Sequence, residues 1–192
     1  MRHLASPIAL AALLAVAAPA ADAMAPMRIA IDCPEVAGGH DLLVLSSPAI
    51  RPNGVIPQKY VDQSPPLAWT PVPGAASYAV VVEDADAGDK ELGLPFVHWL
   101  AWNIPRNAKA LPEGVSGKPG TAIVEGRNQA GKLGYFGPHP PAGPAHHYHI
   151  QLFAISNPVK LPTGSSREQL LGAIKGQVVG KGELVASYAS VR

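Results

Sequence analysis

The fold of this chain is decided by two apolar runs, YAVVVEDAD at residues 78–86 and FVHWLAWNIP at residues 96–105. The first run is continuously apolar and rich in β-branched residues, so residues 77–83 are predicted to form a central strand covered on both faces. The second predicts a long strand at residues 96–104. Strict alternation would place Phe96, His98, Leu100 and Trp102 on one face, and Val97, Trp99, Ala101 and Asn103 on the other.

Shorter elements are expected along the rest of the chain. Further strands are predicted at residues 27–32, 41–45, 121–125, 147–155 and 183–188, and residues 126–144 form a long loop rich in Gly and Pro. One helix is predicted, with a capping box formed by Ser165 and Glu168 and an end at Gly180; its apolar stripe is Leu170, Leu171, Ile174 and Val178. This pattern predicts an all-β fold, an antiparallel β-sandwich with Greek-key-like connections and a peripheral C-terminal helix.

Length and composition indicate one domain at residues 24–192. With 192 residues, 47% of them hydrophobic and 15% charged, the chain can bury a substantial core. A formal charge of +1 and the absence of basic runs argue against nucleic acid as a partner. A single cysteine, Cys33, excludes an internal disulfide.

Residues 1–23 have the three parts of a secretory signal peptide: a short basic start, an Ala/Leu-rich segment at residues 7–18, and a small-x-small site at Ala21-Asp22-Ala23. The apolar segment is too short to span a bilayer. The chain is therefore predicted to be periplasmic or secreted, to begin near Met24 when mature, and to keep no transmembrane segment. The alternative is a disordered Ala-rich leader.

Asp84 and Asp86 follow the first apolar run. If the strand continues through them, both carboxylates lie on one face, where they could accept hydrogen bonds from a cation or share a proton with an anionic oxygen. An ordinary acidic turn is an equal alternative. His98 lies within an apolar strand, where it either donates to a phosphate oxygen or is a buried core histidine with its hydrogen bonds satisfied.

Four more histidines, His139, His146, His147 and His149, lie within eleven positions. Alternation would place His147 and His149 on one strand face and His146 with Tyr148 on the other. A metal site combining histidine with Asp84 or Asp86 is a minority hypothesis, because no ligand spacing here is specific for a metal. The Gly-x-Ser-x-Gly elbow and the Gly-rich phosphate loops are absent, so no catalytic residue and no cofactor are predicted.

Several motifs in order resemble the phosphatidylethanolamine-binding protein family, and most of all its bacterial Raf-kinase-inhibitor-like branch. They are SPPLAW at residues 64–69, DADAG at 84–88, VHW at 97–99, GRN at 126–128, GPHPP at 137–141 and HHY at 146–148. The resemblance implies a β-sandwich with a small surface pocket for phosphate-type anions, including phospholipid head groups. It implies a ligand pocket formed by Asp84, Asp86, His98, His146 and Tyr148, with Pro138, His139, Pro140 and Pro141 as its rim.

The chain departs from the family pattern in four places. The usual Asp-Pro-Asp-Ala-Pro is here Asp84-Ala85-Asp86-Ala87-Gly88, which predicts a less rigid loop. His139 stands where many bacterial relatives have Cys, and the acidic loop after Tyr60 is short. His147 replaces the usual Arg, which removes a permanent positive charge near the anion.

The leading functional hypothesis is an exported, non-enzymatic protein that binds a small phosphorylated or anionic ligand. The first alternative is a regulator that occludes a protease or kinase partner, as some members of the family do. The second is a metal-dependent hydrolase that uses the histidines. The sequence leaves the oligomeric state open, a homodimer included.

Overall fold

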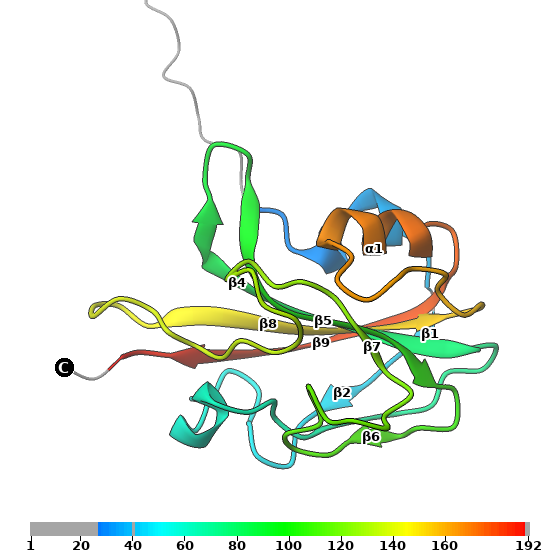
Figure 1. Cartoon of the computed structure of the whole chain (residues 1–192), viewed down its shortest axis with the longest axis horizontal. Helices are drawn as coiled ribbons and strands as arrows, with labels where there is room; N and C mark the ends of the chain where they lie inside the picture. The colour runs from blue at the N-terminus through cyan, green and yellow to red at the C-terminus, as the bar shows by residue number, and fades with distance from the viewer. Residues whose placement is uncertain (1–26, 40, 191–192) are drawn as a thin grey trace, which may run out of the picture.

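The computed structural model describes residues 27–39 and 41–190, so the predicted signal peptide lies outside the described residues. The chain forms three layers (Figure 1). A six-stranded sheet lies in the middle, helix α1 (Arg167–Ile174) covers one of its faces, and a three-stranded sheet covers the other. No helix among these residues is both long enough and apolar enough to cross a membrane.

The elements confirm the predicted all-β class. The large sheet has the order β1 (Asp41–Leu42), β9 (Val178–Tyr188), β8 (His146–Ile155), β4 (Ser77–Asp89), β5 (Leu94–Pro105) and β7 (Val124–Glu125). The small sheet has the order β2 (Leu45–Ser46), β3 (Leu67–Trp69) and β6 (Ala110–Leu111). Three 3-10 helices are also present: η1 (Ala30–Asp32), η2 (Pro34–Val36) and η3 (Gln58–Val61). Every pair of named strands is antiparallel except β1 with β9.

β4 is the central strand, as its composition predicts. It pairs with β8 on one side and with β5 on the other, and residues 77–84 are all buried. Tyr78, Val80 and Val82 pack into the core between the sheets, whereas Ala79 and Val81 pack into the core beneath α1. Burying a Val side chain completely is worth about 1.5–3 kcal/mol, so this strand contributes to both cores at once.

Two of the short strands predicted near the N-terminus are corrected. Residues 27–32 do not form a strand: residues 30–32 form η1, because Cys33 N–H donates to the Ala30 carbonyl and the Ala30 N–H donates to a side chain, the carboxylate of Glu83. Residues 41–45 do not form one strand either. The chain crosses there from β1 in the large sheet to β2 in the small one.

The helix is shorter than predicted. It ends at Ile174, and Gly176, at φ +72°, turns the chain so that Val178 begins β9 instead of completing the apolar stripe. The cap is Ser166, whose hydroxyl accepts from the backbone of Gln169 while the Gln169 side chain accepts from the Ser166 N–H. The strand predicted at 121–125 is reduced to β7.

Register shifts change which side chains share a face. Val82 pairs with Trp99 and Glu83 pairs with Val97, so His98 is an extra residue in a β-bulge. The predicted grouping of His98 with Leu100 and Trp102 is therefore wrong: those two residues pack with Val97 beneath α1. A larger shift follows, because Asp84 pairs with Phe96 and Gly88 with Pro95, which leaves residues 85–87 without partners on β5.

A buried ion pair ties the helix layer to the sheet. Glu83 is fully buried, and its carboxylate accepts from Arg167 Nε, from Gln151 Nε2 at 2.8 Å and from the Ala30 N–H at 2.7 Å. Arg167 also donates through Nη2 to the Arg28 carbonyl at 2.7 Å. One carboxylate therefore joins β4, β8, α1 and the segment that carries η1.

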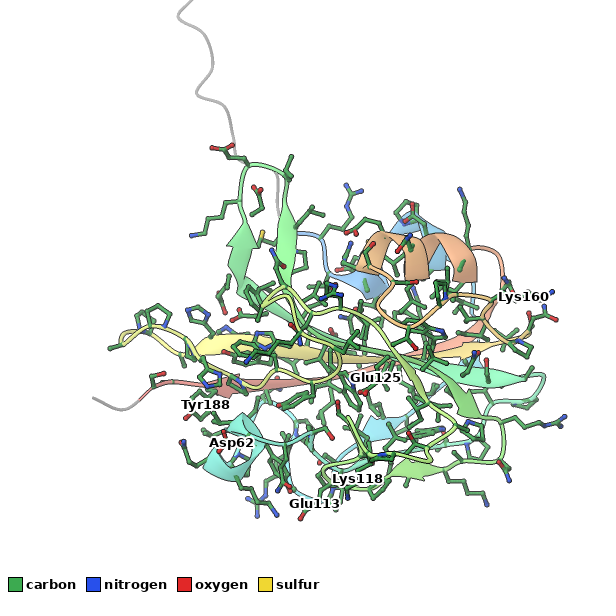
Figure 2. All side chains as sticks on the ribbon, viewed as in Figure 1. Asp62, Glu113, Lys118, Glu125, Lys160 and Tyr188 are labelled. Carbon is green, nitrogen blue, oxygen red and sulfur yellow. The ribbon has the colours of Figure 1, made fainter. Side chains whose placement is uncertain are left out.

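The long loop after β7 is held in place at two points, one just before it begins and one past its middle. Glu125, near the middle of Figure 2, accepts from Trp99 Nε1 at 2.7 Å and from the Gly117 N–H at 2.9 Å. Further along, Gly137 lies against η3, where an added Cβ would be 2.1 Å from the Val61 carbonyl oxygen. Only glycine allows so close an approach between these two backbones.

We predict that Arg167→Ala lowers the free energy of unfolding by roughly 3–5 kcal/mol, because the Glu83 carboxylate would stay buried without its charge partner. Urea denaturation measures this loss. The matched control is Lys59→Ala, which removes the exposed ion pair with Glu113 and should leave stability almost unchanged. The double variant Glu83→Gln/Arg167→Met should recover part of the stability, since neither charge remains. A loss below about 1 kcal/mol for Arg167→Ala would show that the pair is not structural.

Gly137→Ala should destabilise the fold by roughly 1–3 kcal/mol, because the new methyl group would push the loop away from η3. The control is Gly172→Ala within α1, where an added Cβ meets nothing within 4 Å. That change should be neutral or stabilising by up to about 1 kcal/mol. Thermal unfolding compares the two, and equal melting temperatures would contradict the close contact.

Candidate functional site

A small pocket lies where β4, β5 and β8 meet the 126–144 loop. It has a volume of about 120 Å³ and is lined by Asp84, Ala87, Phe96, His98, Phe136, His139, Pro140, Pro141, His146 and Tyr148. Seven of the nine residues predicted for the pocket and its rim are in this set. The other two, Asp86 and Pro138, do not line the pocket.

Asp84 is the buried anion of the pocket. It pairs across the sheet with Tyr148, on the face of β4 that also carries Val82. Its Oδ1 accepts from the backbone N–H groups of Asp86 at 2.8 Å and Ala87 at 3.1 Å, and its Oδ2 accepts from His146 Nδ1 at 2.7 Å. The carboxylate therefore stabilises the following turn and also orients the His146 imidazole. Asp84 thus has both roles that the sequence suggested, a turn residue and a group of the site.

Asp86 faces away from this pocket, which corrects the expectation that it shares a face with Asp84. Its Oδ2 accepts from His147 at both the backbone N–H, 2.6 Å away, and Nδ1, 2.8 Å away. Partial burial favours the neutral acid, but these hydrogen bonds outweigh it and hold the pKa of Asp86 below its ordinary value. The physical reason is the bulge at residues 85–87, which breaks the alternation.

His98 lies in the pocket wall and is 4% exposed. Its Nδ1 is 2.6 Å from the Phe136 carbonyl oxygen, and the Phe136 N–H donates back to the His98 carbonyl at 2.9 Å. The ring stacks on Phe136 at 5.8 Å and meets Tyr148 edge-on at 5.1 Å. Burial lowers the pKa of His98, although hydrogen bonds to the backbone of Phe136 and Gly137 and the charge of Asp84 act in the opposite direction.

The hydroxyl group of Tyr148 has no hydrogen-bond partner among the described residues, although the side chain is 1% exposed. Burial, with the nearby negative charge of Asp84, raises the pKa of Tyr148. The hydroxyl group therefore keeps its proton, and the Asp84 carboxylate lies near it without making a hydrogen bond of normal geometry. A buried donor left unpaired costs free energy, so this group is suited to an acceptor that arrives with a ligand.

The alternation predicted for β8 is reproduced by the contacts. His146 and Tyr148 line the pocket, whereas His147 bonds to Asp86 and His149 bonds through Nδ1 to Glu183 at 2.7 Å. The hydrogen bond to Glu183 raises the pKa of His149. His146 therefore lies on one face of β8, and His147 and His149 lie on the other.

The rim comes from residues 137–141. His139 is exposed, stacks on Phe136 at 4.9 Å, and its Nδ1 is 2.9 Å from the Gly137 carbonyl. Pro140 is buried and accepts through its carbonyl from Ser190 Oγ at 2.6 Å. Pro138 is buried and does not line the pocket.

The sequence reasoning missed Ala87, Phe96 and Phe136. Phe96 could have been predicted, because alternation places it on the same face as His98. The two ring centroids lie 4.9 Å apart. Phe136 belongs to an irregular loop in which no periodicity applies. Its position depends on the pairing with His98 described above.

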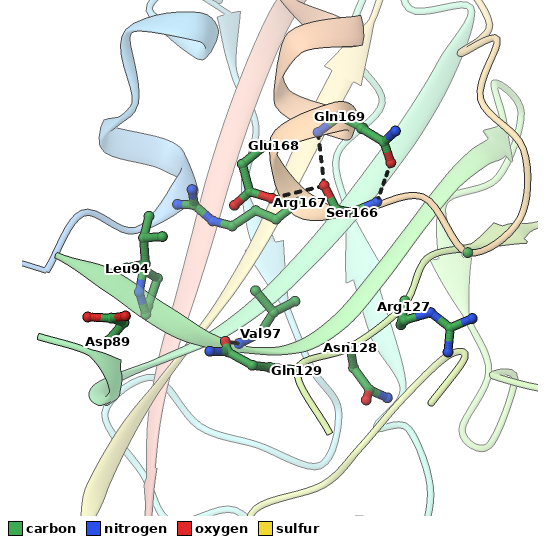
Figure 3. Close-up of a pocket in the computed structure, with 12 residues that line it drawn as sticks. Asp89, Leu94, Val97, Arg127, Asn128, Gln129, Ser166, Arg167, Glu168 and Gln169 are labelled. Carbon is green, nitrogen blue, oxygen red and sulfur yellow. Dashed lines mark hydrogen bonds between the residues drawn. The ribbon is translucent and has the colours of Figure 1, made fainter. Parts of the chain in front are cut away.

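A larger groove, of about 400 Å³, lies beside the N-terminus of α1 (Figure 3). Its polar wall contains Ser166, Arg167, Glu168 and Gln169, and its floor includes Val97 and Gln129. Several of these groups are already paired within the protein: Gln129 Oε1 accepts from the Val97 N–H, and Ser166 Oγ donates to Glu168. The predicted site residues lie outside this groove, so the smaller pocket is the candidate site.

The histidine-rich composition raises the question of a metal. Within residues 27–39 and 41–190, three or more His, Cys, Asp or Glu side chains are nowhere grouped so as to hold a metal ion. The arrangement instead offers hydrogen-bonding groups: the Tyr148 hydroxyl donor, the ring nitrogens and one carboxylate, set among aromatic rings.

Comparison with known proteins gives consistent matches. A family model described as phosphatidylethanolamine-binding protein matches residues 46–189. The UPF0098 protein of Methanothermobacter thermautotrophicus is 38% identical over 151 residues, which is 75% of this chain and 97% of the relative. A Mycobacterium tuberculosis protein named as a lipoprotein, LppC, is 31% identical over 168 residues, 85% of this chain and 80% of the relative.

Among solved structures, CT736 from Chlamydia trachomatis, named as a phosphatidylethanolamine-binding protein homologue, has a TM-score of 0.71 and 30% identity. The match covers 78% of this chain and 99% of that one. The sequence motifs lie within the residues that the family model matches, and the chain belongs to the phosphatidylethanolamine-binding protein family.

Proposed function

We propose that this chain is an exported, non-enzymatic binding protein whose small pocket holds a phosphate-type anion, either a free phosphorylated compound or a phospholipid head group. The observation that carries the proposal is the Tyr148 hydroxyl group, which is buried in the pocket wall without a partner. A ligand oxygen would give this donor the acceptor that the protein does not provide.

The remaining groups of the pocket support the same ligand class. His146 is oriented by Asp84 through Nδ1, so its other ring nitrogen is left for a ligand. The aromatic rings of Phe96 and Phe136 exclude water from one side, which strengthens polar contacts made inside. The volume is below the 300–1,000 Å³ or so typical of sites for drug-sized ligands, which suits a single phosphate group rather than a whole lipid.

Binding is tested by titration calorimetry with phosphoethanolamine, which should give saturable heat at pH 7. Tyr148→Phe should weaken the binding about tenfold, the loss of roughly one hydrogen bond. Its melting temperature should not fall, because the hydroxyl group that is removed has no partner in the free protein. A role confined to stability predicts the reverse of this pattern.

The matched control is His149→Ala, on the opposite face of β8, where the ring bonds to Glu183. That variant should bind phosphoethanolamine as the wild type does. If neither phosphoethanolamine nor inorganic phosphate gives heat with the wild-type protein, the proposal of an anion pocket fails.

Export is the second part of the proposal, supported by the sequence of residues 1–23 and by the relative named as a lipoprotein. Mass spectrometry of the protein from fractionated cells should find a mature chain that begins near Met24, in the periplasm or the medium. Recovery of the chain with Met1 intact from the cytoplasm would contradict export.

A further inference from the structure

The groove of about 400 Å³ beside α1 is a second cavity, and it shares no lining residue with the pocket at the ends of β4, β5 and β8. Its volume lies within the roughly 300–1,000 Å³ typical of sites that bind small molecules. Apolar side chains from the start of β5 line it, Leu94, Pro95 and Val97, and polar side chains surround them. The groove therefore has the size and lining of a ligand site that the proposed function does not use.

Opposite charges lie at the two ends of the groove. In Figure 3, Asp89 at the end of β4 lies at one end, and Arg127 on the loop after β7 lies at the other. Neither forms an ion pair in the part of the chain that the structure describes. Asp89 uses only Oδ1, which accepts from the N–H groups of Glu91 and Leu92 at 3.0 Å, and Arg127 donates only through Nη1, to the Gly131 carbonyl. One carboxylate oxygen and most of one guanidinium thus remain for a ligand.

The other charged residues of the lining keep this polarity. The charge of Arg167 is balanced by the buried carboxylate of Glu83. Glu168 accepts through Oε2 from Ser166 Oγ at 2.9 Å, and Figure 3 shows it beside Arg167 rather than beside Arg127. The cation that has no partner of its own is therefore Arg127.

Two side-chain amides line the groove in fixed orientations. Gln129 Oε1 accepts from the Val97 N–H at 3.1 Å, and Gln169 Oε1 accepts from the Ser166 N–H at 2.9 Å. Because a backbone N–H can only donate, the amide atom that faces it is the oxygen, and the other atom is the NH2 nitrogen. Neither NH2 group has a hydrogen-bond partner within residues 27–39 and 41–190. Both are donors that suit the carbonyl groups of a ligand.

The edge of β5 beside the groove does not accept another strand. Pro95 has no N–H, and Gln129 already occupies both backbone groups of Val97: its Oε1 accepts from the N–H, and its own N–H donates to the carbonyl at 2.9 Å. A proline and a capped edge prevent the hydrogen-bond ladder that an added strand requires. An occupant must therefore be recognised by its charged ends and its carbonyl groups.

We infer that the groove is a second binding site, for a short peptide with free ends. The ammonium group of the peptide lies at Asp89 and its carboxylate lies at Arg127. Its backbone carbonyls accept from the NH2 groups of Gln129 and Gln169, and an apolar side chain packs on the start of β5. Exposed ion pairs are weak, so the two ends set the direction of the peptide more than its affinity.

The test is nuclear magnetic resonance of the isotope-labelled protein, titrated with the tripeptide alanyl-leucyl-alanine. The side-chain NH2 signals of Gln129 and Gln169 should shift and saturate together. Acetylation removes the ammonium charge of the peptide and amidation removes its carboxylate charge. Each change should weaken binding about two- to fivefold, which is the contribution of one exposed ion pair.

Two variants assign the ends of the peptide. Asp89→Asn keeps an oxygen for the turn but loses the charge, so its binding should no longer respond to acetylation while it still responds to amidation. Arg127→Gln should show the reverse pattern. The matched control is Arg51→Gln, an exposed arginine outside the groove, which should respond to both changes as the wild type does.

The outcomes concern the groove alone. The inference is overturned if the tripeptide leaves the two NH2 signals unshifted at millimolar concentration, or if blocking either end has no effect on the wild-type protein. It is also overturned if free acetate shifts both signals as far as the tripeptide does, since the groove would then bind an anion alone. Tyr148→Phe, in the other pocket, should bind the tripeptide unchanged, so the anion site stands or fails separately.

Discussion

The double pairing of β4 is the constraint on which the rest of the structure depends. The strand has long antiparallel partners on both sides, and through residue 84 it is buried on both faces. Its even residues face the core between the two sheets and its odd residues face the core beneath α1. The strand can therefore move neither along its neighbours nor about its axis without exposing one of the cores. Asp84, at the end of the buried part of β4, is therefore held rigidly in place, as a preorganised binding site requires.

The same alternation gives two adjacent carboxylates opposite roles. Glu83 points into the helix side, where Arg167, Gln151 and a backbone N–H satisfy it completely. Asp84 points to the side of the small sheet, where it holds His146 and the following turn. A charge that is fully paired inside a protein is structural, whereas one that lines a cavity can still act on a ligand. Two neighbouring residues thus have separate roles: Glu83 joins the sheet to the helix layer, and Asp84 places a negative charge in the pocket.

The sequence predicts the regular parts of this fold and fails at its irregular ones. Alternation works along β8 because that strand pairs with β4 without interruption, so His146 and Tyr148 could be placed together correctly. Alternation fails at His98 and Asp86, because both lie where the pairing of β4 with β5 is interrupted by a bulge. A bulge forms when one strand has more residues than its partner over the same length, and the sequence of a single strand does not reveal this. The predicted capping box of Ser165 and Glu168 is also wrong, because the cap is Ser166 with Gln169. Ser165 and Ser166 are each followed three residues later by Glu or Gln, and only the bond from Ser165 Oγ to the Pro162 carbonyl removes the first from the cap.

The histidines of the pocket share a feature that bears on how any ligand is recognised. In His98, His139 and His146, Nδ1 is held by a carbonyl or carboxylate oxygen of the protein, at 2.6, 2.9 and 2.7 Å. Their rings are therefore oriented before a ligand arrives, and little side-chain entropy is lost on binding. Because the pocket is small, the remainder of a larger ligand must extend past the rim, where His139 is exposed. Recognition of the charged group thus depends on the rigid sheet, and recognition of whatever is attached to it depends on the 137–141 segment, which Gly137 and Ser190 anchor.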